Sequence, residues 1–344
     1  MTKKEAFRAF VFLCVSICAF CGLASVLKIK NTDGAERFNT FYKEEKNSLD
    51  AVYIGSSGTD RYWNAPMAYH DYGIAVYPLT TNSQPVAAIK GCIREVLKTQ
   101  NPEVFIVEIR SVRKVVDQIT DSTLHQAVEF MKPSFNRLKT TKEIMDFRGY
   151  GLAESMECYI PFIKFHSRWE KIKKTDFVKK YSDLKGTWVG KKASFMRNGM
   201  EMISKPTRDQ APVQEKVETV LRDLMEFCNE NNVKVLFVAS PFNVDLEARK
   251  EFNYTMDLAS QYGFPSIDFN QIYDEVGIDF SHDFYNKEHV NIYGSEKYTR
   301  YLSNYLMEHY NMQDKRNDPV YASWEDSYQK YEKIIKKGKQ TWGE

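Results

Sequence analysis

The stretch Asp50-Ala-Val-Tyr-Ile-Gly-Ser-Ser57 decides the fold, because a short apolar run ends there in small residues. Apolar runs of the same kind recur at residues 73–77, 104–109, 233–239 and 265–269, and helical patterns at residues 85–100, 214–232 and 294–310 lie among them. The central runs are apolar throughout, which is typical of strands buried on both faces of a parallel sheet. Strands alternating with helices therefore predict an α/β fold, a three-layer sandwich around a mostly parallel five-stranded sheet.

The first candidate site follows this opening strand. In Ile54-Gly55-Ser56-Ser57-Gly58 a serine stands at a turn with backbone N–H groups beside it. Ligands of such folds gather at the carboxyl ends of the strands, and a nucleophile there needs N–H donors for a developing oxyanion. Gly-Ser-Ser is also an ordinary junction between a strand and a loop, so this motif alone leaves both interpretations open.

The second candidate is Asp283-Phe-Tyr-Asn-Lys-Glu-His289-Val-Asn291, just before the last helical pattern. A histidine near the end of an α/β domain supplies a general base, and an acid a few residues upstream orients it. A single histidine is more often structural. The pairing of this segment with the serine motif, at opposite ends of the domain, favours a reactive pair of Ser57 and His289.

Further blocks match one known pattern. They are Gly55-Ser56-Ser57 with Tyr62-Trp63-Asn64-Ala65-Pro66, then Tyr72-Gly73-Ile74, Tyr77-Pro78-Leu79 and Ser83-Gln84, and last Asp283-Phe-Tyr-Asn286-Lys-Glu-His289-Val-Asn291-Ile-Tyr-Gly294. With them the chain resembles the SGNH (GDSL-like) hydrolase superfamily over roughly residues 50–110 and 233–310. It is most similar to the membrane-anchored branch that includes the D-alanyl transfer protein of teichoic acids and alginate O-acetylation proteins. The resemblance implies an SGNH/flavodoxin-like sandwich.

The resemblance also assigns roles to residues. Ser57 becomes the nucleophile and His289 the base, while Asn286 stands where the superfamily has its acid, and Asp283 is the alternative partner of the imidazole. In serine proteases the corresponding Asp-to-Asn change lowers turnover about 10⁴-fold, because an amide cannot stabilise an imidazolium by charge. Positions that meet the substrate or the oxyanion carry over to Gly55, Ser56, Thr81, Asn82, Ser83 and Gln84. The chain departs from the superfamily pattern at Thr81 or Asn82, where a Gly is usual, and at Pro78, where an Asn is usual.

The implied function is an extracytoplasmic O-acyl (above all acetyl) transferase or esterase that acts on a cell-envelope polysaccharide. One source of the acyl group is a membrane-bound O-acyltransferase partner. The alternative, favoured by Asn286, is a catalytically weak or inactive SGNH-fold module that binds glycan or scaffolds a membrane acylation assembly. No cofactor and no metal site are expected, because the sequence has no Gly-rich phosphate loop, no HExxH and no clustered Cys and His. A net charge of +2 does not suggest nucleic-acid binding.

An N-terminal membrane anchor is expected at residues 9–27, an uncharged segment of about nineteen residues, which is enough to span a bilayer as a helix. A cleaved signal peptide is the alternative, although its apolar region is normally shorter and ends at a small-x-small site. With a retained anchor, residues 1–8 are expected to form a cytoplasmic tail. Residues 28–47 are interpreted as a stalk or a short helix. The large domain is expected outside the cell membrane, on the strength of the resemblance.

The remaining organisation follows from composition. Residues 48–312 are interpreted as the SGNH-like domain, interrupted at residues 111–212 by a largely helical insertion with 20 Lys and Arg against 12 Asp and Glu. This insertion is interpreted as a lid with its own small core, or as a surface that meets an anionic polymer, a membrane or a membrane partner. Residues 313–344 form a charged amphipathic tail, in which Trp324, Tyr328, Tyr331 and Ile335 recur at helical spacing.

Overall fold

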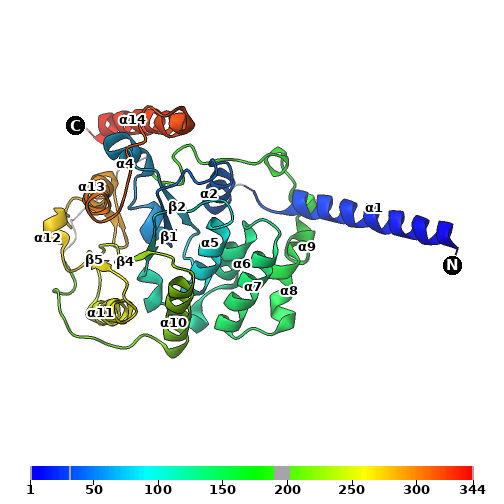
Figure 1. Cartoon of the computed structure of the whole chain (residues 1–344), viewed down its shortest axis with the longest axis horizontal. Coiled ribbons are helices and arrows are strands. Elements are labelled where there is room, and N and C mark those ends of the chain that lie inside the picture. The colour runs from blue at the N-terminus through cyan, green and yellow to red at the C-terminus, as the bar shows by residue number, and fades with distance from the viewer. Residues whose placement is uncertain (1, 31, 190–201, 343–344) are drawn as a thin grey trace.

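A five-stranded parallel sheet with the order β2-β1-β3-β4-β5 lies at the centre of the molecule (Figure 1). The computed structural model describes residues 2–30, 32–189 and 202–342. The strands are β1 (Ala51–Gly55), β2 (Val76–Thr80), β3 (Val104–Glu108), β4 (Val235–Ala239) and β5 (Ser266–Asp268). Every residue of β1 to β4 is buried, which is why these runs are apolar throughout. The predicted α/β sandwich with a mostly parallel five-stranded sheet is confirmed.

The second strand begins later than its sequence pattern predicts. The apolar run at residues 73–77 predicts a strand there, but β2 starts at Val76. Gly73 instead ends helix α4 (Ala65–Tyr72) in the left-handed conformation, with φ of 75°, and its N–H donates to the Tyr69 carbonyl at 2.8 Å. Glycine is favoured at this position because a Cβ would be strained there. The start of the predicted strand is therefore wrong, although the strand itself exists.

The strand order has a switch point between β1 and β3. The chain crosses from β1 to β2 on one side and then returns past β1 to β3, β4 and β5 on the other. Right-handed crossovers put α4 on one face and the helices of the later crossovers on the opposite face. Those later helices are α5 (Ile89–Val96), α10 (Glu215–Glu230) and α11 (Leu246–Gln261). The direction in which successive strands are added to the sheet reverses between β1 and β3. In folds of this strand order, ligands bind at the carboxyl ends of these two strands.

The last helix of the sandwich, α13 (Ile292–His309), packs beside α4 (Figure 1). It is held to the sheet through its tyrosines, since the hydroxyls of Tyr53 in β1 and Tyr298 in α13 lie 2.7 Å apart in the core. A two-stranded antiparallel ribbon, β6 (Phe284–Asn286) and β7 (His289–Val290), precedes α13. The short helix α12 (Tyr273–Val276) lies between β5 and this ribbon. The ribbon therefore leads from the edge strand β5 back to the helix that covers β1.

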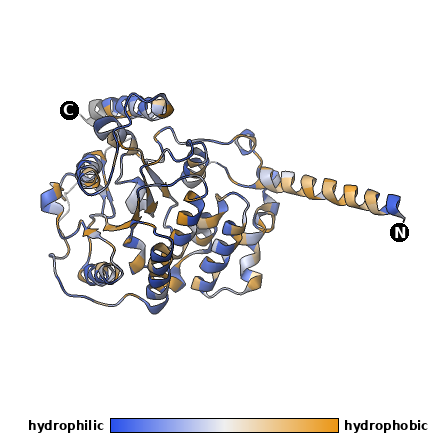
Figure 2. Cartoon of the chain, viewed as in Figure 1, coloured by the Kyte–Doolittle hydropathy of each residue, from blue (hydrophilic) through white to orange (hydrophobic). Residues whose placement is uncertain are grey.

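The N-terminal helix α1 (Lys3–Leu27) projects away from the domain (Figure 1). Figure 2 shows that its residues are hydrophobic along most of its length, and large side chains such as Phe7, Phe10 and Phe12 are exposed. Among the described residues it is the one helix long and apolar enough to cross a membrane, and a signal sequence has the same properties. The helix begins at Lys3, so most of the expected tail at residues 1–8 is part of it.

Residues 28–47 contain a helix that belongs to the domain. Helix α2 (Asp33–Phe41) begins at its N-cap Thr32, whose side chain accepts the N–H of Ala35, and it packs against β2. Phe38 and Phe41 on this helix are almost fully buried in the main core. The interpretation of this stretch as a stalk is therefore wrong, and its alternative, a short helix, is what the structure has. Two aromatic side chains on one face supply the apolar area that attaches the helix to the sheet.

The insertion shares the main core. Its helices are α6 (Asp121–Glu129), α7 (Phe135–Arg148), α8 (Leu152–Tyr159) and α9 (Pro161–Phe165), followed by the 3-10 turns η4 (His166–Lys171) and η5 (Lys174–Phe177). Buried residues of α6 and α7, such as Leu124 and Ile144, belong to the same apolar cluster as the sheet. The prediction of a separate small core is therefore wrong for the described part of the insertion. Its residues 190–201 lie outside the described residues.

The C-terminal segment ends in helix α14 (Ala322–Trp342), which packs along α4 (Figure 1). Trp324, Tyr331 and Ile335 are buried, as their helical spacing predicts, and the ring of Tyr328 stacks on His70 with 3.6 Å between the centroids. The buried Lys185 connects this helix to the rest of the molecule, since its Nζ donates to Ser323 Oγ at 2.8 Å and to Glu44 Oε1 at 2.7 Å. Helix α14 is thus a docked part of the domain.

Candidate functional site

Ser57 stands at the carboxyl end of β1, as the first residue of the short helix α3 (Ser57–Asp60). The glycines on both sides of the Ser56-Ser57 pair are required by close packing. A Cβ on Gly55 would lie 2.5 Å from the Cβ of Glu108, and a Cβ on Gly58 would lie 2.7 Å from the Glu108 carboxyl carbon. The two glycines therefore let a side chain at the end of β3 approach directly beneath the serine turn.

His289 contacts this serine. Its Nε2 lies 2.7 Å from Ser57 Oγ, although 232 positions separate the two residues in the chain. On the other side of the ring, Nδ1 lies 3.1 Å from Asn286 Oδ1. Asn286 and His289 face each other across the β6–β7 ribbon, so the register of that ribbon sets the contact. The structure thus brings together three of the predicted residues in the order Ser57, His289, Asn286.

The hydrogen bonds of Asn286 define the protonation of the imidazole. The backbone N–H of Glu288 donates to Asn286 Oδ1 at 2.9 Å, which identifies the atom facing His289 as the amide oxygen. An amide oxygen only accepts, so Nδ1 of His289 carries the proton and donates it to Asn286. Nε2 is then unprotonated and accepts the hydroxyl hydrogen of Ser57. This is the tautomer that a general base needs.

Asp283, the alternative partner of the imidazole, does not contact His289. Its carboxylate is fully buried, where it accepts the N–H of Asp279 at 2.8 Å and pairs with Lys297 Nζ at 2.7 Å. It also lies 2.9 Å from Nδ1 of His282. These contacts hold the loop before β6 against α13. The structure therefore places Asp283 in a supporting position and Asn286 against the ring of His289.

The surroundings of His289 favour its neutral form. Burial is the largest effect, and the positive charges of Arg110 and Arg61 add to it, so that the pKa of His289 is lowered to about 3. Asn286 supplies no opposing charge. The imidazole is therefore available to accept a proton at neutral pH, but the imidazolium formed after it does so is poorly stabilised.

A pH profile tests this directly. A base with an unperturbed imidazole loses activity as the pH falls through about 6.5, whereas His289 with its lowered pKa stays neutral well below that value. We expect the rate of acylation of Ser57 to be unchanged between about pH 8 and pH 5 and to fall only in stronger acid. Stopped-flow measurement of the acylation phase at each pH checks this, and a half-maximal rate near pH 6.5 would contradict it.

A buried charged network, which the sequence motifs do not predict, lies beneath the serine turn. Glu108 at the end of β3 accepts the Ser56 hydroxyl at 3.3 Å, the Ser240 hydroxyl at 3.3 Å and the backbone N–H of Arg110 at 3.0 Å. The Arg110 guanidinium in turn donates to Glu288 at 2.7 Å. Burial raises the pKa of Glu108, and Arg110 and the hydrogen bonds oppose that shift. A charged residue at the end of the apolar run at residues 104–109 was the available signal.

Removing the Glu108 carboxyl tests how much it contributes to the stability of the serine turn. We expect Glu108→Ala to lower the free energy of unfolding by about 3 kcal/mol, because it leaves buried donors of Ser56, Ser240 and Arg110 without their acceptor. The matched control is Glu103→Ala, directly before the start of the same strand, which removes a surface pair with Lys234 and costs at most about 1 kcal/mol. Urea unfolding of the full-length chain in detergent measures both, and equal losses would contradict the assignment.

The rings of Tyr285 and Trp188 form a second feature next to His289, which we call the aromatic wall. The ring of Tyr285 stacks on that of His289 with 5.7 Å between centroids, and the ring of Trp188 lies tilted against Tyr285, also with 5.7 Å between centroids. Arg61 covers the Trp188 ring at 3.7 Å and donates to the Tyr285 hydroxyl at 2.9 Å. Trp188 comes from the insertion, and its backbone N–H donates to the carbonyl of Asp60 at 2.9 Å. Part of the insertion therefore reaches the site, while α6 to α9 lie on the α5 side of the domain (Figure 1).

The predicted oxyanion positions differ in their exposure and in their hydrogen bonds. Gly55 and Ser56 lie directly before the nucleophile, and Thr80 Oγ1 joins the β2 end to them by donating to the carbonyl of Ser56 at 3.1 Å. The N–H of Thr81 is already used, since it donates to Gln84 Oε1 at 3.1 Å. Asn82 and Ser83 are exposed, and the buried Nε2 of Gln84 has no partner. The side-chain amide of Gln84 is therefore a buried donor of this loop without a partner, whereas the N–H of Thr81 is occupied.

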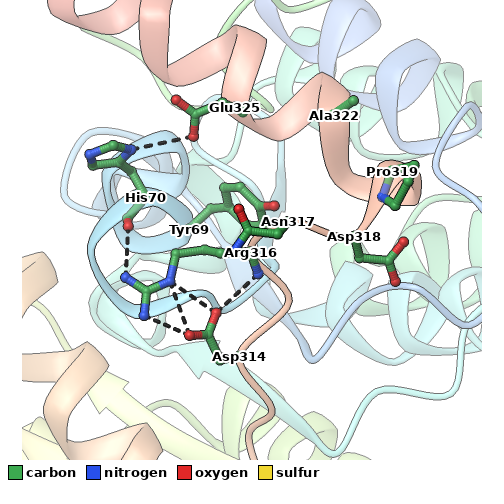
Figure 3. A pocket seen from close by; sticks show the side chains of 9 residues that line it. All are labelled: Tyr69, His70, Asp314, Arg316, Asn317, Asp318, Pro319, Ala322 and Glu325. Carbon is green, nitrogen blue, oxygen red and sulfur yellow. Dashed lines mark hydrogen bonds and ion pairs between the residues drawn. The ribbon is translucent and has the colours of Figure 1, made fainter.

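A separate hollow of about 650 Å³ lies between α4 and the C-terminal segment (Figure 3). Its polar side chains satisfy one another, as Arg316 pairs with Asp314 at 2.6 Å and His70 lies 3.3 Å from Glu325. Neither Ser57 nor His289 lines it. The described residues contain no group of three or more His, Cys, Asp or Glu placed to hold a metal ion. The Ser57 site is therefore the centre on which a chemical proposal can rest.

Comparisons with known proteins add no family. The sequence matches no protein-family model and no curated protein. Among solved structures it is similar to a gut microbial diltiazem-metabolizing enzyme, with 14% identity and a TM-score of 0.27 over 77% of this chain and 48% of that one. The chain thus spans about half the length of that enzyme. A similarity this low carries no argument about the function of this protein.

Proposed function

We propose that this protein is a membrane-anchored O-acyltransferase or esterase of the SGNH type, which uses Ser57 as nucleophile on a cell-envelope polysaccharide. The observation that carries the proposal is the chain of contacts from Ser57 Oγ to His289 Nε2 at 2.7 Å and from His289 Nδ1 to Asn286 at 3.1 Å. These distances lie within hydrogen-bond reach of a nucleophile, its base and a group that orients the base. Their position at the carboxyl ends of β1 and β3 agrees with ligand sites of this fold.

The reaction begins with acylation of the serine. Ser57 Oγ attacks the carbonyl carbon of an acyl donor while His289 Nε2 takes the hydroxyl proton, and the oxyanion that forms accepts the backbone N–H of Ser57. The tetrahedral intermediate then expels the donor's oxygen, which receives the proton from His289. An acyl ester on Ser57 remains. A sugar hydroxyl then attacks that ester while His289 takes its proton. The second tetrahedral intermediate expels Ser57 Oγ, which receives this proton from His289, and the acyl group remains on the sugar; water in place of the sugar gives hydrolysis.

Two features support a glycan at the membrane as the acceptor. The rings of Tyr285 and Trp188 stand beside His289, and flat aromatic surfaces of this kind are suited to packing against sugar rings. Helix α1 as a retained anchor would hold the domain at the outer face of the cell membrane. An acyl group delivered by a membrane-bound O-acyltransferase partner would then reach Ser57 without a soluble donor.

A second function is favoured by one observation, the amide of Asn286 in the place of a carboxylate against His289. With no charge to stabilise the imidazolium, the domain would bind glycan or scaffold an acylation assembly with little or no turnover. This alternative uses the same aromatic wall and the same anchor. It differs only in whether Ser57 forms a covalent bond.

Covalent labelling separates the two functions. The purified full-length chain in detergent is treated with a fluorophosphonate probe, the adduct is mapped by peptide mass spectrometry, and acetate release from p-nitrophenyl acetate is followed in parallel. An adduct on Ser57 together with acetate release supports the enzyme. Absence of both, in a preparation that unfolds cooperatively, contradicts it and supports the binding module.

A further inference from the structure

The end of α1 is held by one segment of the insertion. We call residues 161–180, which run from the start of α9 through η4 and η5 to the third residue after η5, the collar. The ring of Phe162 in the collar packs against the ring of Phe20 in α1 in a tilted arrangement, with 4.8 Å between the ring centroids. The Arg168 guanidinium donates to the carbonyl of Leu27 and also pairs with Asp176 at 3.1 Å. Lys30, just past the helix, donates to the carbonyl of Asp176. The collar is therefore packed against the same helix that has the properties of a membrane span.

The collar exposes large apolar side chains that the fold leaves uncovered. Trp169, Phe177 and Val178 are 66%, 64% and 61% exposed. An exposed Trp and Phe within ten residues of each other are unusual on a water-facing surface, where large apolar patches mark contact sites. Tryptophan in particular is enriched at the headgroup level of membranes, because its ring is apolar and its N–H is polar.

Basic side chains surround these apolar groups. Lys171, Lys173, Lys174, Lys179 and Lys180 all lie in the collar and are exposed. None of them forms an ion pair with an acidic residue in the described part of the chain, unlike Arg168. Clusters of lysine next to a membrane span are attracted to anionic lipid headgroups, and their apolar stems reach along the interface.

The position of the collar along α1 agrees with the headgroup level of a membrane. Phe20 precedes the end of α1 by seven residues, which corresponds to about 10 Å along a helix axis. If residues 9–27 of α1 span the bilayer core, Leu27 lies at the boundary between acyl chains and headgroups, and Phe20 lies about 10 Å inside that boundary. Arg168 of the collar, which contacts Leu27, is then at the headgroup level, and Phe162, which contacts Phe20, reaches among the acyl chains. Apolar rings, unpaired lysines and this depth therefore coincide in one segment.

From these observations we infer that the collar is a lipid-binding surface, which inserts Trp169 and Phe177 into the interface around α1 and binds anionic phospholipid headgroups through its lysines. An anionic polymer or a protein partner is disfavoured because the surface is continuous with the spanning helix, so a bilayer that surrounds α1 meets the collar first. The inference goes beyond the acyl chemistry and rests only on α1 being a retained anchor. Bound in this way, the collar would keep the domain from tilting freely on its helix.

Tryptophan quenching in nanodiscs tests the inference on the full-length chain. The discs contain either phosphatidylcholine alone or phosphatidylcholine with phosphatidylglycerol, and a part of the phosphatidylcholine carries bromine on the upper acyl chain. The emission of Trp169 is taken as the difference between the native chain and Trp169→Phe. We expect this emission to be quenched more strongly in the anionic discs, and the Lys171→Gln, Lys173→Gln, Lys174→Gln triple variant to lose that increase.

Controls separate the collar from the anchor. Phe12→Trp places a reporter in the middle of α1, and its quenching by lipids brominated deep in the acyl chain shows that the helix is in the bilayer. The triple variant Lys330→Gln, Lys333→Gln, Lys336→Gln removes the same charge from α14 and should leave Trp169 quenching unchanged. An unquenched Trp169 beside a quenched residue 12 overturns the inference. Equal quenching in both kinds of disc also overturns it, because lipid charge would then play no part.

Discussion

Replacement of Ser57 by alanine is expected to abolish fluorophosphonate labelling and to lower acetate release by a factor on the order of 10³ or more. The reason is that no other nucleophile takes its place. Ser56, the adjacent hydroxyl, is buried and donates to Glu108, so it is not directed at His289. His289 then has only water to activate, without an acyl ester to divide the reaction into two easier steps.

The measurement compares Ser57→Ala with a serine change that touches nothing near the site. Ser122→Ala on the exposed face of α6 is suited to this, because it removes the same hydroxyl from a solvent-facing position. Both variants should unfold at the urea concentration of the native chain. Retention of acetate release by Ser57→Ala would show that the measured activity does not pass through this serine and would contradict the proposed mechanism.

Asn286→Asp is expected to have the opposite effect and to increase the rate of acylation at least about tenfold. A carboxylate against Nδ1 stabilises the imidazolium, so the pKa of His289 should rise from its lowered value and the ring should become a stronger base. The change of about 10⁴-fold in serine proteases is the ceiling. Asn286 is exposed to solvent, which screens the new charge, so the gain should fall short of that ceiling.

The pH profile of Asn286→Asp tests independently whether the pKa of His289 rises. The acid limb of the acylation rate should move upward toward the pH of about 6.5 of an ordinary imidazole, since the added charge opposes burial and the two arginines. Asn286→Leu, which keeps the size but removes the acceptor, should lower the rate because Nδ1 loses its partner. A rate for Asn286→Asp that is equal to or below that of the native chain would contradict the role of Asn286 in orienting and tuning His289.

The order of strands explains why these few residues control the site. Ser57 follows β1, Glu108 ends β3 and Arg110 follows it, and the order in which strands are added reverses between β1 and β3, where ligands of such folds bind. Arg110 has two effects at the site. It donates a hydrogen bond to Glu288, which precedes His289, and its positive charge helps to lower the pKa of His289. A buried arginine beside a general base weakens the stability of its protonated form. Asn286→Asp is the substitution that would offset this cost.

Much of the architecture could be predicted from the sequence, because it depends on local patterns. Runs such as that ending at Ser57 predict buried strands through their composition alone, and the spacing of Trp324, Tyr331 and Ile335 predicts one buried face of a helix. The apolar helix at the N-terminus follows from length and absence of charge. The choice of Ser57 and His289 came from two short motifs and a resemblance, and the structure places them within 2.7 Å.

What only the tertiary structure decided are the contacts between segments distant in the chain. The register of β6 and β7 selects Asn286 over Asp283 as the partner of His289, and nothing local in that segment distinguishes the two. The buried position of Glu108 beneath the serine turn depends on β1 and β3 lying side by side. The collar likewise meets α1 across more than a hundred residues. Periodicity reports which face of an element is buried, but it carries no information on which element covers that face, and it is this second property that sets the chemistry of the site.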